Sequence, residues 1–358
     1  MVSPPTDLKS ILKQAAEQAG FDLFGVAPAG DSPELRLFPE WIAAGRAGEM
    51  KYLESRDEQG HLKRGSLSRV APWARSVIVC AINYNTEHPY STEVKDSGRG
   101  WISRYAWSRE DYHDAVLSRL KQVEAAIHEH MAQPSSPLVT RSYVDTGPIV
   151  ERVFAKYAGV GWLGKNTCLI NQQKGSWLFL GVILTSLELT ADLPAPDRCG
   201  SCTRCIQACP TEAIVAPYQL DSNKCISYLT IEKRGSIPEE LRPEIGRHVF
   251  GCDICQDVCP WNRKAPVSNA PEFQPRPGLV NPALDWLAEL SVSDFQQTFR
   301  RSPIRRTKRS GMRRNVAIAI GNSGDCRLIP TLDNLLADED PGVVEAANWA
   351  KSRLAKQG

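Results

Sequence analysis

The sequence predicts an α+β fold with a cysteine-rich module and a helical C-terminal part. Three observations predict it: helical and strand-like apolar patterns alternate in the first half, eight cysteines lie between two proline-rich joints, and the pattern becomes helical beyond Pro282. The chain has 358 residues and 42% hydrophobic residues, which supports more than one core without disulfide bonds. We expect three domains, over residues 1–190, 191–265 and 279–358.

The elements of the first domain follow from the spacing of apolar residues. Within 111–131, for example, Val116, Leu120, Val123 and Ile127 fall on one face of a helix. Short runs rich in β-branched and aromatic residues indicate strands. The sequence predicts helices over 7–20, 111–131 and 149–157, and strands over 21–27, 76–83, 137–144 and 176–187.

The joints that bound the second domain are LPAPDR (193–198) and APVSNAPEFQPRPG (265–278). In the third domain, the segments that start at Met312 and Val343 share small and apolar residues at a similar phase. They lie about 30 residues apart, a spacing typical of helical repeats. This pattern predicts a short helical-hairpin repeat.

Composition narrows the location of the protein. The N-terminus lacks an apolar segment after a basic start, and the run WLFLGVIL (177–184) is too short to span a bilayer. We therefore expect a soluble cytoplasmic protein that is not embedded in a membrane. Disulfides are rare in that compartment, so clustered cysteines indicate metal ligands or redox chemistry.

The cysteines form the strongest motif. The first run, C-x2-C-x2-C-x3-C-P, is typical of two-cluster iron–sulfur proteins, in which the fourth thiolate binds the second cluster. A later run ending in Pro260 supplies the remaining ligands. We assign one 4Fe-4S cluster to Cys199, Cys202, Cys205 and Cys259, and the other to Cys209, Cys225, Cys252 and Cys255.

The alternative is a pair of structural zinc sites, since C-x2-C pairs also bind zinc. The third and fourth cysteines of the run and both C-P endings favour iron–sulfur clusters. Cys80, Cys168 and Cys326 remain, and we interpret them as small core residues.

Two further motifs have ordinary structural interpretations. Asp145, in the turn DTGP (145–148), is suited to cap a helix that begins shortly afterwards. GVGWLG (159–164) matches G-x-G-x-x-G but follows a predicted helix, which argues against a dinucleotide site.

A set of motifs in order resembles the epoxyqueuosine reductase family. The set is FGVA from Phe24, RYA from Arg104, DYH from Asp111, DTGP from Asp145, GWLGKNT from Gly161, GSW from Gly175, and both cysteine groups. The resemblance covers nearly the whole chain, because the family also ends in a short HEAT-like repeat. It implies a cobalamin-binding α/β catalytic domain similar to reductive dehalogenases, a ferredoxin-like two-cluster module and a HEAT-like tail.

The resemblance also implies an activity. The family reduces epoxyqueuosine to queuosine at the wobble position of tRNA, using cobalamin and electrons delivered through two 4Fe-4S clusters. The matching aspartate, Asp145, is the expected proton donor, since loss of the epoxide oxygen consumes two electrons and two protons. Arg64, Asp145, Lys165 and Asn166 are the expected cobalamin contacts. Because DYHDAV (111–116) lacks the D-x-H-x-x-G motif, we expect no histidine ligand to cobalt and a helix N-terminal or core role for His113.

The expected partners are the tRNA anticodon stem-loop and an external electron donor, and we expect a monomer. Residues 301–358 hold eleven Lys and Arg against six Asp and Glu, so the tail is basic. A solvated helix face is the alternative to phosphate binding. The predicted tRNA contacts are Arg305, Arg306, Lys308, Arg309, Arg313 and Arg314.

Two other functions stay open from the sequence. A corrinoid reductive dehalogenase would share both cofactors, but it would normally carry an export signal and no basic tail. A non-enzymatic iron–sulfur electron carrier would not need about 190 residues ahead of its clusters.

Overall fold

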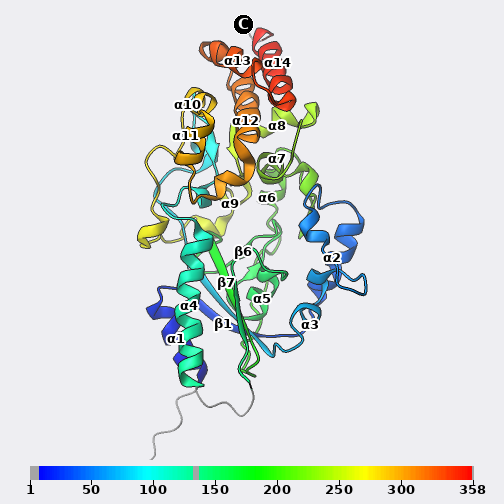
Figure 1. The fold of residues 1–358 in the computed structure, drawn as a ribbon, viewed down its shortest axis with the longest axis vertical. Helices are drawn as coiled ribbons and strands as arrows, with labels where there is room; N and C mark the ends of the chain where they lie inside the picture. Colours follow the sequence, from blue (N-terminus) through cyan, green and yellow to red (C-terminus); the bar gives the residue numbers. More distant parts are fainter. Residues whose placement is uncertain (1–7, 132–136, 357–358) are drawn as a thin grey trace, which may run out of the picture.

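A four-stranded antiparallel sheet lies at the centre of the N-terminal part in the computed structural model, which describes residues 8–131 and 137–356 (Figure 1). Its strand order is β1-β2-β7-β4. The antiparallel pairing confirms the α+β prediction and shows that this part is not a parallel α/β sheet. The strands are β1 (Leu23–Pro28), β2 (Ser76–Asn83), β4 (Thr140–Tyr143) and β7 (Leu178–Thr185).

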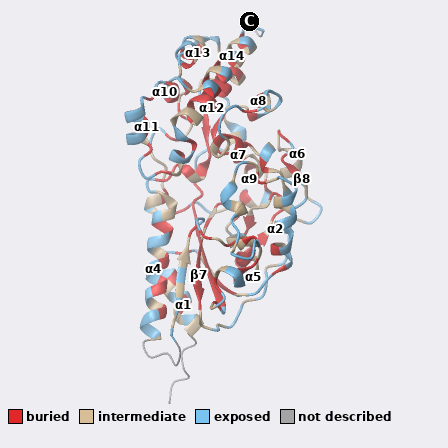
Figure 2. Cartoon of the chain, turned by 45° about the vertical axis from the view of Figure 1, so that its right-hand side comes forward, coloured by how far each residue is buried: buried red, intermediate tan, exposed pale blue. Residues whose placement is uncertain are grey.

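Helices cover both faces of this sheet. Most of β7 is therefore buried, as its colour in Figure 2 shows. On one face, α1 (Leu8–Gln18) and α4 (Tyr112–His130) pack through Leu12, Val116 and Leu120. On the other, α5 (Glu151–Tyr157) packs together with α2 (Pro33–Ala43) and α3 (Leu67–Val70). All eight residues of β2 are buried, because the strand has neighbours on both edges and helices on both faces.

The predicted elements of residues 7–187 are present, and their observed ends lie inside the predicted ranges or one residue beyond. Asp7, the first residue of the first predicted helix, lies outside the described residues. Among the described residues, no helix has both the length and the apolar character that a membrane span requires.

The cysteine module is joined to the N-terminal part by a strand pair. β3 (Trp101–Ile102) pairs in parallel with β10 (His248–Phe250), so a segment from the first predicted domain completes a sheet with one from the second. Two further strand pairs are hairpins. One pairs β5 (Trp162–Leu163) with β6 (Leu169–Ile170), and the other pairs β8 (Ile214–Ala216) with β9 (Gln219–Leu220). The module's helices are α6 (Arg204–Gln207), α7 (Ile226–Ile231), α8 (Arg242–Ile245) and α9 (Ile254–Asp257).

The C-terminal part is helical, as predicted. The two similar segments form α12 (Lys308–Ser323) and α14 (Pro341–Ala355), which pack against each other. The other helices are α10 (Leu284–Glu289), α11 (Val292–Thr298) and α13 (Ile329–Leu336). Their assignment as a HEAT-like repeat stays a prediction.

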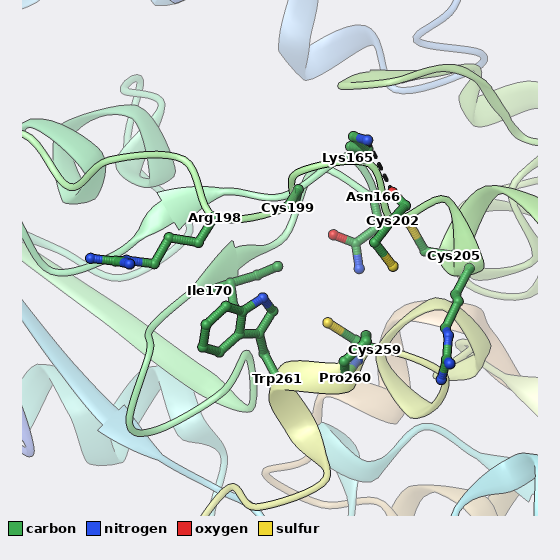
Figure 3. A pocket seen from close by; sticks show the side chains of 11 residues that line it. Lys165, Asn166, Ile170, Arg198, Cys199, Cys202, Cys205, Cys259, Pro260 and Trp261 are labelled. Carbon is green, nitrogen blue, oxygen red and sulfur yellow. Dashed lines mark hydrogen bonds between the residues drawn. The ribbon is translucent and has the colours of Figure 1, made fainter.

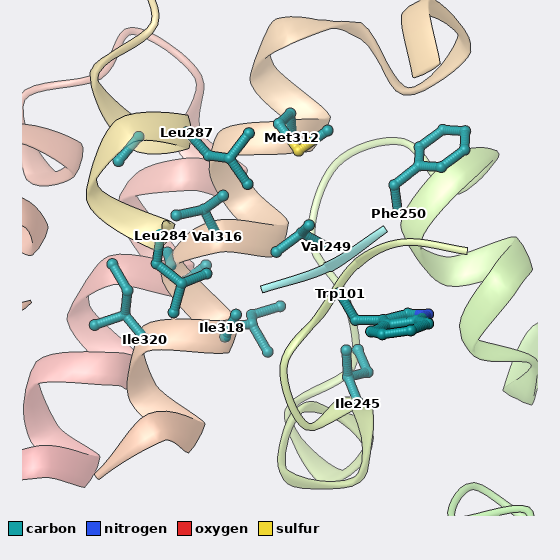
Figure 4. Packing of buried hydrophobic residues seen from close by; sticks show 14 of the residues in the cluster. Trp101, Ile245, Val249, Phe250, Leu284, Leu287, Met312, Val316, Ile318 and Ile320 are labelled. Carbon is teal, nitrogen blue, oxygen red and sulfur yellow. The ribbon is translucent and has the colours of Figure 1, made fainter. Parts of the chain in front are cut away.

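One apolar core links these C-terminal helices to the cysteine module. Figure 4 shows Met312, Val316 and Ile318 of α12 packed near Val249 of β10 and Trp101 of β3. The core therefore contains residues of all three predicted domains and crosses both boundaries between them. It fixes the helical tail relative to the cysteines and to the end of the N-terminal part.

Candidate active site and cysteine module

Asp145 lies in the turn between β4 and α5, in a left-handed backbone conformation with φ of 58°. Such a φ is uncommon outside glycine and occurs where the surroundings enforce it. Here the Asp145 N–H donates to Oε1 of Glu151 at 2.7 Å. The helix cap is Val150, so the interpretation of Asp145 as an N-cap is wrong.

The Asp145 carboxylate meets the start of α4. The Tyr112 hydroxyl donates to Oδ2 of Asp145 at 2.8 Å, and Nε2 of His113 lies 3.7 Å from the same oxygen. Nδ1 of His113 contacts Oδ1 of Asp111 at 2.7 Å, and Asp111 caps α4 by accepting the His113 N–H. The imidazole is thus held between two carboxylates. His113 has the predicted helix N-terminal position, but it faces Asp145 instead of the core.

These contacts separate the pKa values of the acids. Interaction with His113, and then the Tyr112 hydrogen bond, lowers the pKa of Asp145 to about 2 against the effect of burial. Burial favours neutral His113, but the carboxylates of Asp111 and Asp145 outweigh it and raise its pKa to about 9. Burial, with the charge of Asp145, raises the pKa of Glu151 to about 8. Near neutral pH, Asp145 is ionised while His113 and Glu151 hold protons.

Arg64 lies against the turn that contains Asp145. Its guanidinium donates to the carbonyl oxygens of Gly147 at 2.8 Å and Tyr52 at 2.9 Å. Burial lowers the pKa of Arg64, an effect opposed by Tyr52 and Asp145. The structure therefore brings together two of the four predicted cobalamin contacts, Arg64 and Asp145.

The ring of Tyr52 connects this turn to the basic segment. The guanidinium carbons of Arg64 and Arg306 lie 5.7 Å and 5.2 Å from the ring centroid. Arg306 also pairs with Glu232, and that pairing outweighs burial to raise the pKa of Arg306, with a further contribution from Asp145. Arg306, in the basic run of residues 300–314, thus lies close to the Asp145 turn.

Lys165 and Asn166 contact the cysteine loops. The Lys165 ammonium donates to the carbonyl oxygens of Gly200 and Cys202, and the Asn166 amide donates to that of Cys255. The reason is the β5–β6 hairpin, whose turn projects both residues toward the cysteine module. The role of these two residues as cobalamin contacts stays a prediction.

The glycines of this hairpin also have a structural role. A Cβ on Gly161 would lie 2.4 Å from the Ile170 carbonyl oxygen, and one on Gly164 would lie 2.5 Å from the Ile170 side chain. The two glycines therefore let β5 and β6 pack closely. As predicted, the G-x-G-x-x-G match follows a helix, α5.

The first predicted thiol group lines a single cavity of about 230 Å³ (Figure 3). Lys165, Asn166 and Trp261 line the same cavity. Segments more than fifty residues apart thus bring together the four cysteines assigned to one cluster: Cys199, Cys202, Cys205 and Cys259.

The second thiol group lies against the main apolar core, which packs on Cys225 and Cys252. Burial raises the pKa of both thiols, and the charges of Cys225 and Cys209 raise that of Cys252 further. For Cys255, hydrogen bonding to Cys168 raises the pKa first and burial adds to it. These electrostatic contacts place Cys209, Cys225, Cys252 and Cys255 together, as assigned.

The three remaining cysteines have different surroundings. Cys80 is fully buried in β2, as predicted for a core residue. Cys326 is exposed, so its prediction as a core residue is wrong. Cys168 lies beside Cys255, and hydrogen bonding between the thiols lowers the pKa of Cys168. Its place in the hairpin turn, next to Asn166, explains this contact.

Asp253, between two of the ligand cysteines, was not predicted as a site residue. Its buried carboxylate accepts hydrogen bonds from Trp101 Nε1 at 3.0 Å, from the Arg104 N–H at 2.7 Å and from the Ser103 hydroxyl. It therefore fastens the Cys252–Cys255 loop to β3 and the segment after it. Only its position inside the cysteine motif could have indicated this role.

Arg152 connects the Asp145 turn to the second thiol group. Its guanidinium donates to the Thr167 carbonyl oxygen at 2.7 Å, and its charge contributes to the lowered pKa values of Asp145 and Cys168. The second thiol group therefore lies on the side of the module that faces Asp145.

Among the described residues, no three His, Cys, Asp or Glu side chains converge closely enough to hold a single metal ion.

The basic run, residues 300–314, contains both exposed and internal arginines and lysines. Arg305, Arg306 and Lys308 are exposed and Arg309 is half-buried. Arg313 pairs with Asp338 at 2.9 Å. Arg314 is 3% exposed and donates to three backbone carbonyl oxygens, those of Leu229, Lys233 and Gly235.

Two family models match the regions that carry these sites. The model described as "Epoxyqueuosine reductase QueG, DUF1730" matches residues 64–146, which include Arg64 and Asp145. The model described as "4Fe-4S double cluster binding domain" matches residues 198–262, which include all eight predicted ligand cysteines.

Curated relatives extend the similarity over the chain. An epoxyqueuosine reductase of a Synechocystis species is 44% identical over 296 residues, or 81% of this chain and 98% of the relative. One from Xanthomonas campestris is 36% identical over 99% of this chain and 97% of its own length. The chain belongs to the epoxyqueuosine reductase family. It is therefore an oxidoreductase with a double-cluster iron–sulfur domain.

Solved epoxyqueuosine reductases have the same fold. One, crystallised with an epoxyqueuosine-modified tRNA-Tyr stem loop, is 31% identical, with a TM-score of 0.85 over 97% of this chain and 90% of its own. The Bacillus subtilis enzyme, in a form whose catalytic aspartate loop is swung out of the active site, has a TM-score of 0.84 at 30% identity over 97% of this chain and 90% of its own.

Proposed function

We propose that this chain reduces epoxyqueuosine to queuosine at the wobble position of tRNA, with Asp145 as the proton donor, cobalamin as the reactive cofactor and two 4Fe-4S clusters as its electron supply. One observation carries the proposal: a carboxylate held in a strained turn, with proton-bearing neighbours, lies beside a module that gathers two groups of four thiols. A pure electron carrier has no use for such an acid.

Cobalamin is implied by the family, and the residues around Asp145 fit a reactive group placed there. The Asp145 side chain is 66% exposed, and its protein partners all lie at the starts of α4 and α5. Arg64, which contacts the Asp145 turn, is a second predicted cobalamin contact at this place. Lys165 and Asn166, the other two predicted cobalamin contacts, also contact the cysteine loops. When bound and reduced, cobalamin supplies a strongly nucleophilic or reducing centre.

The residues around Asp145 hold and move the proton. Opening the epoxide and losing its oxygen requires two protons, so a positioned acid accelerates the reaction. Asp145 is ionised at rest, and the imidazolium of His113 is the adjacent proton store. His113 supplies one of the two protons through Asp145, which delivers it to the substrate oxygen, and solvent at the exposed carboxylate supplies the other. Asp111 keeps the imidazole oriented during this transfer.

The two thiol groups have different surroundings, which suggests the order in which electrons pass between them. The first lines a cavity, whereas the second packs against the main apolar core through Cys225 and Cys252 and faces the Asp145 turn through Cys168 and Arg152. Clusters held by these groups supply single electrons from an external donor. This arrangement favours entry of electrons at the first group and their use beside the second.

The exposed members of the basic run are suited to tRNA. Phosphate contacts from Lys and Arg provide most of the affinity for RNA backbones, and RNA loops present unpaired bases beside phosphate-rich stems. Arg306 and Arg64 both lie against the Tyr52 ring, so a stem held by Arg305, Arg306 and Lys308 brings its loop toward Asp145. Arg313 and Arg314 stabilise the fold instead. We also propose a monomer in the cytoplasm as the working form.

Reconstitution tests this function against its rivals. After anaerobic incubation with iron, sulfide and cobalamin, we expect a visible spectrum with both iron–sulfur and corrin bands. Clusters without bound corrin would support the electron carrier. With a reductant present, turnover of an aryl halide but not of epoxyqueuosine-containing tRNA would support the dehalogenase.

A further inference from the structure

Lys165 is a buried cation at the tip of the β5–β6 hairpin. The turn is closed by hydrogen bonds from the Gly164 N–H to the Cys168 carbonyl and from the Thr167 N–H to the Gly164 carbonyl, both at 2.8 Å. Thr167 has a φ of 65°, which completes the tight reversal. The Lys165 residue is 9% exposed.

The ammonium ties this hairpin to the loop of the first thiol group. Its Nζ donates to the Gly200 carbonyl oxygen at 2.6 Å and to that of Cys202 at 3.0 Å. The Lys165 carbonyl oxygen accepts the Tyr218 N–H at 3.0 Å. Its side chain therefore has a fixed position on the wall of the cavity lined by the four thiols (Figure 3).

No ion pair neutralises this charge within residues 8–131 and 137–356. Every salt bridge there involves another basic group, so Lys165 has only carbonyl partners. A buried ammonium is costly unless an anion is near it. Four thiolates that hold an iron–sulfur cluster give a net negative centre, and the four thiols line the same cavity as Lys165.

The second thiol group has different neighbours. Its loop contains the carboxyl group of Asp253, which accepts hydrogen bonds from β3 and from the residues that follow. Asn166, the next residue, lines the cavity of the first group as well, but its neutral amide donates to the Cys255 carbonyl oxygen in the loop of the second. Of the two neighbours, Lys165 thus brings a cation to the loop of the first group, and Asn166 brings a neutral amide to the loop of the second.

We propose that Lys165 is the counter-charge of the first thiol group and raises the reduction potential of the iron–sulfur centre held there. Reduction adds an electron to a centre that is already negative, so a fixed positive charge stabilises the reduced form more than the oxidised form. The inference rests on the iron–sulfur part of the proposed function. Lys165 is a positioning residue for electron supply, and it does not touch the substrate.

The test compares Lys165→Gln and Lys165→Arg with the wild type by EPR-monitored redox titration of the anaerobically purified, cluster-loaded chain. Neither tRNA nor cobalamin is present, so the result is independent of whether epoxyqueuosine is the substrate. Cys202→Ala identifies the signal of the first centre by its loss. Lys174→Gln is a matched control, because this lysine follows the same hairpin but pairs with Asp22.

We expect Lys165→Gln to shift the midpoint potential of the first centre to a more negative value while the second centre stays unchanged. Lys165→Arg and Lys174→Gln should stay close to the wild type. An unchanged first midpoint in Lys165→Gln with full iron content, or an equal shift of both centres, would overturn the proposal. If Lys165→Gln loses the first centre, retention of iron and potential in Lys165→Arg supports the charge role, and loss in both variants contradicts it.

Discussion

Nε2 of His113 lies 3.7 Å from Oδ2 of Asp145, and Nδ1 of the same ring contacts Asp111 at 2.7 Å. This arrangement lowers the pKa of Asp145 to about 2 and raises that of His113 to about 9. The carboxylate that we propose as the proton donor is therefore ionised near neutral pH, while the adjacent imidazole holds a proton. The proposed catalysis then depends on the pair and not on Asp145 alone.

Replacement of Asp145 by Asn removes the group that delivers the proton. General acids contribute about 10²- to 10⁴-fold to rates, so we expect a loss of that size in single-turnover reduction. Thermal stability and tRNA affinity should stay near wild-type values, because Asn has nearly the same shape and its amide oxygen can still accept the Tyr112 hydroxyl. Asp333→Asn, which alters a surface ion pair with Lys351, is the control. Near-normal turnover of Asp145→Asn would assign the acid to another residue.

The pH dependence of turnover should report the proton store. Below a pH of about 9 His113 is protonated, so the single-turnover rate should fall as the pH rises through that value. Glu151 and Tyr112 also face Asp145, and loss of the Glu151 proton near pH 8 adds negative charge on the same side. In His113→Gln, the alkaline limb near pH 9 should disappear. Persistence of that limb in His113→Gln would contradict the proposed relay.

Glu151 should act by holding the Asp145 turn. Its Oε1 accepts the Asp145 N–H at 2.7 Å in a turn with positive φ. Glu151→Gln keeps an acceptor, so we expect a change in rate of about threefold or less, whereas Glu151→Ala leaves the N–H unpaired and should cost about tenfold or more. Single-turnover rates and amide hydrogen exchange of residues 144–147 measure both effects. Equal rates in the two variants would show that this hydrogen bond does not position the acid.

Much of this site could be predicted from sequence patterns. Strand and helix periodicity located the elements around Asp145, and the cysteine spacing predicted two groups whose members the fold brings together. Lys165 could not be assigned in this way, because its contacts depend on a hairpin turn that points at a loop 35 residues further along the chain. Asn166 and Asp253 share that difficulty, since their partners belong to distant segments.

Burial of the basic run shows a related limit. A dense run of Arg and Lys predicts a charged surface, but helix α12 turns Arg313 and Arg314 into the core that joins the tail to the cysteine module. Sequence periodicity could not reveal this, because α12 is buried on nearly every side. Only knowledge of the β10 and α7 segments packed against it separates phosphate-binding arginines from structural ones.

The exposed and internal arginines should respond differently to substitution. Combined Arg305→Gln, Arg306→Gln and Lys308→Gln should weaken tRNA binding and reduce the slope of log affinity against log salt by about 0.7 to 0.9 for each lost phosphate contact. Iron content and melting temperature should change little. Fluorescence anisotropy with a labelled anticodon stem-loop at several salt concentrations measures both quantities. Unchanged affinity and slope would place the RNA elsewhere.

Arg314→Gln should instead destabilise the fold. The guanidinium satisfies three backbone carbonyl oxygens, so its loss should cost about 2–4 kcal/mol in the free energy of unfolding. Denaturant titration of the cluster-loaded protein measures this change. A weakened RNA affinity in Arg314→Gln with unaltered stability would return this residue to the set of phosphate contacts.

Anaerobic single turnover of epoxyqueuosine-containing tRNA tests the central claim most directly. The cluster-loaded chain is supplied with a strong one-electron reductant, with or without cobalamin, and the nucleosides are analysed by mass spectrometry after digestion. We expect queuosine to form only with cobalamin present, and to be nearly absent with Asp145→Asn. Formation of queuosine at the same rate without cobalamin, or no queuosine from the fully loaded wild-type protein, would contradict the account.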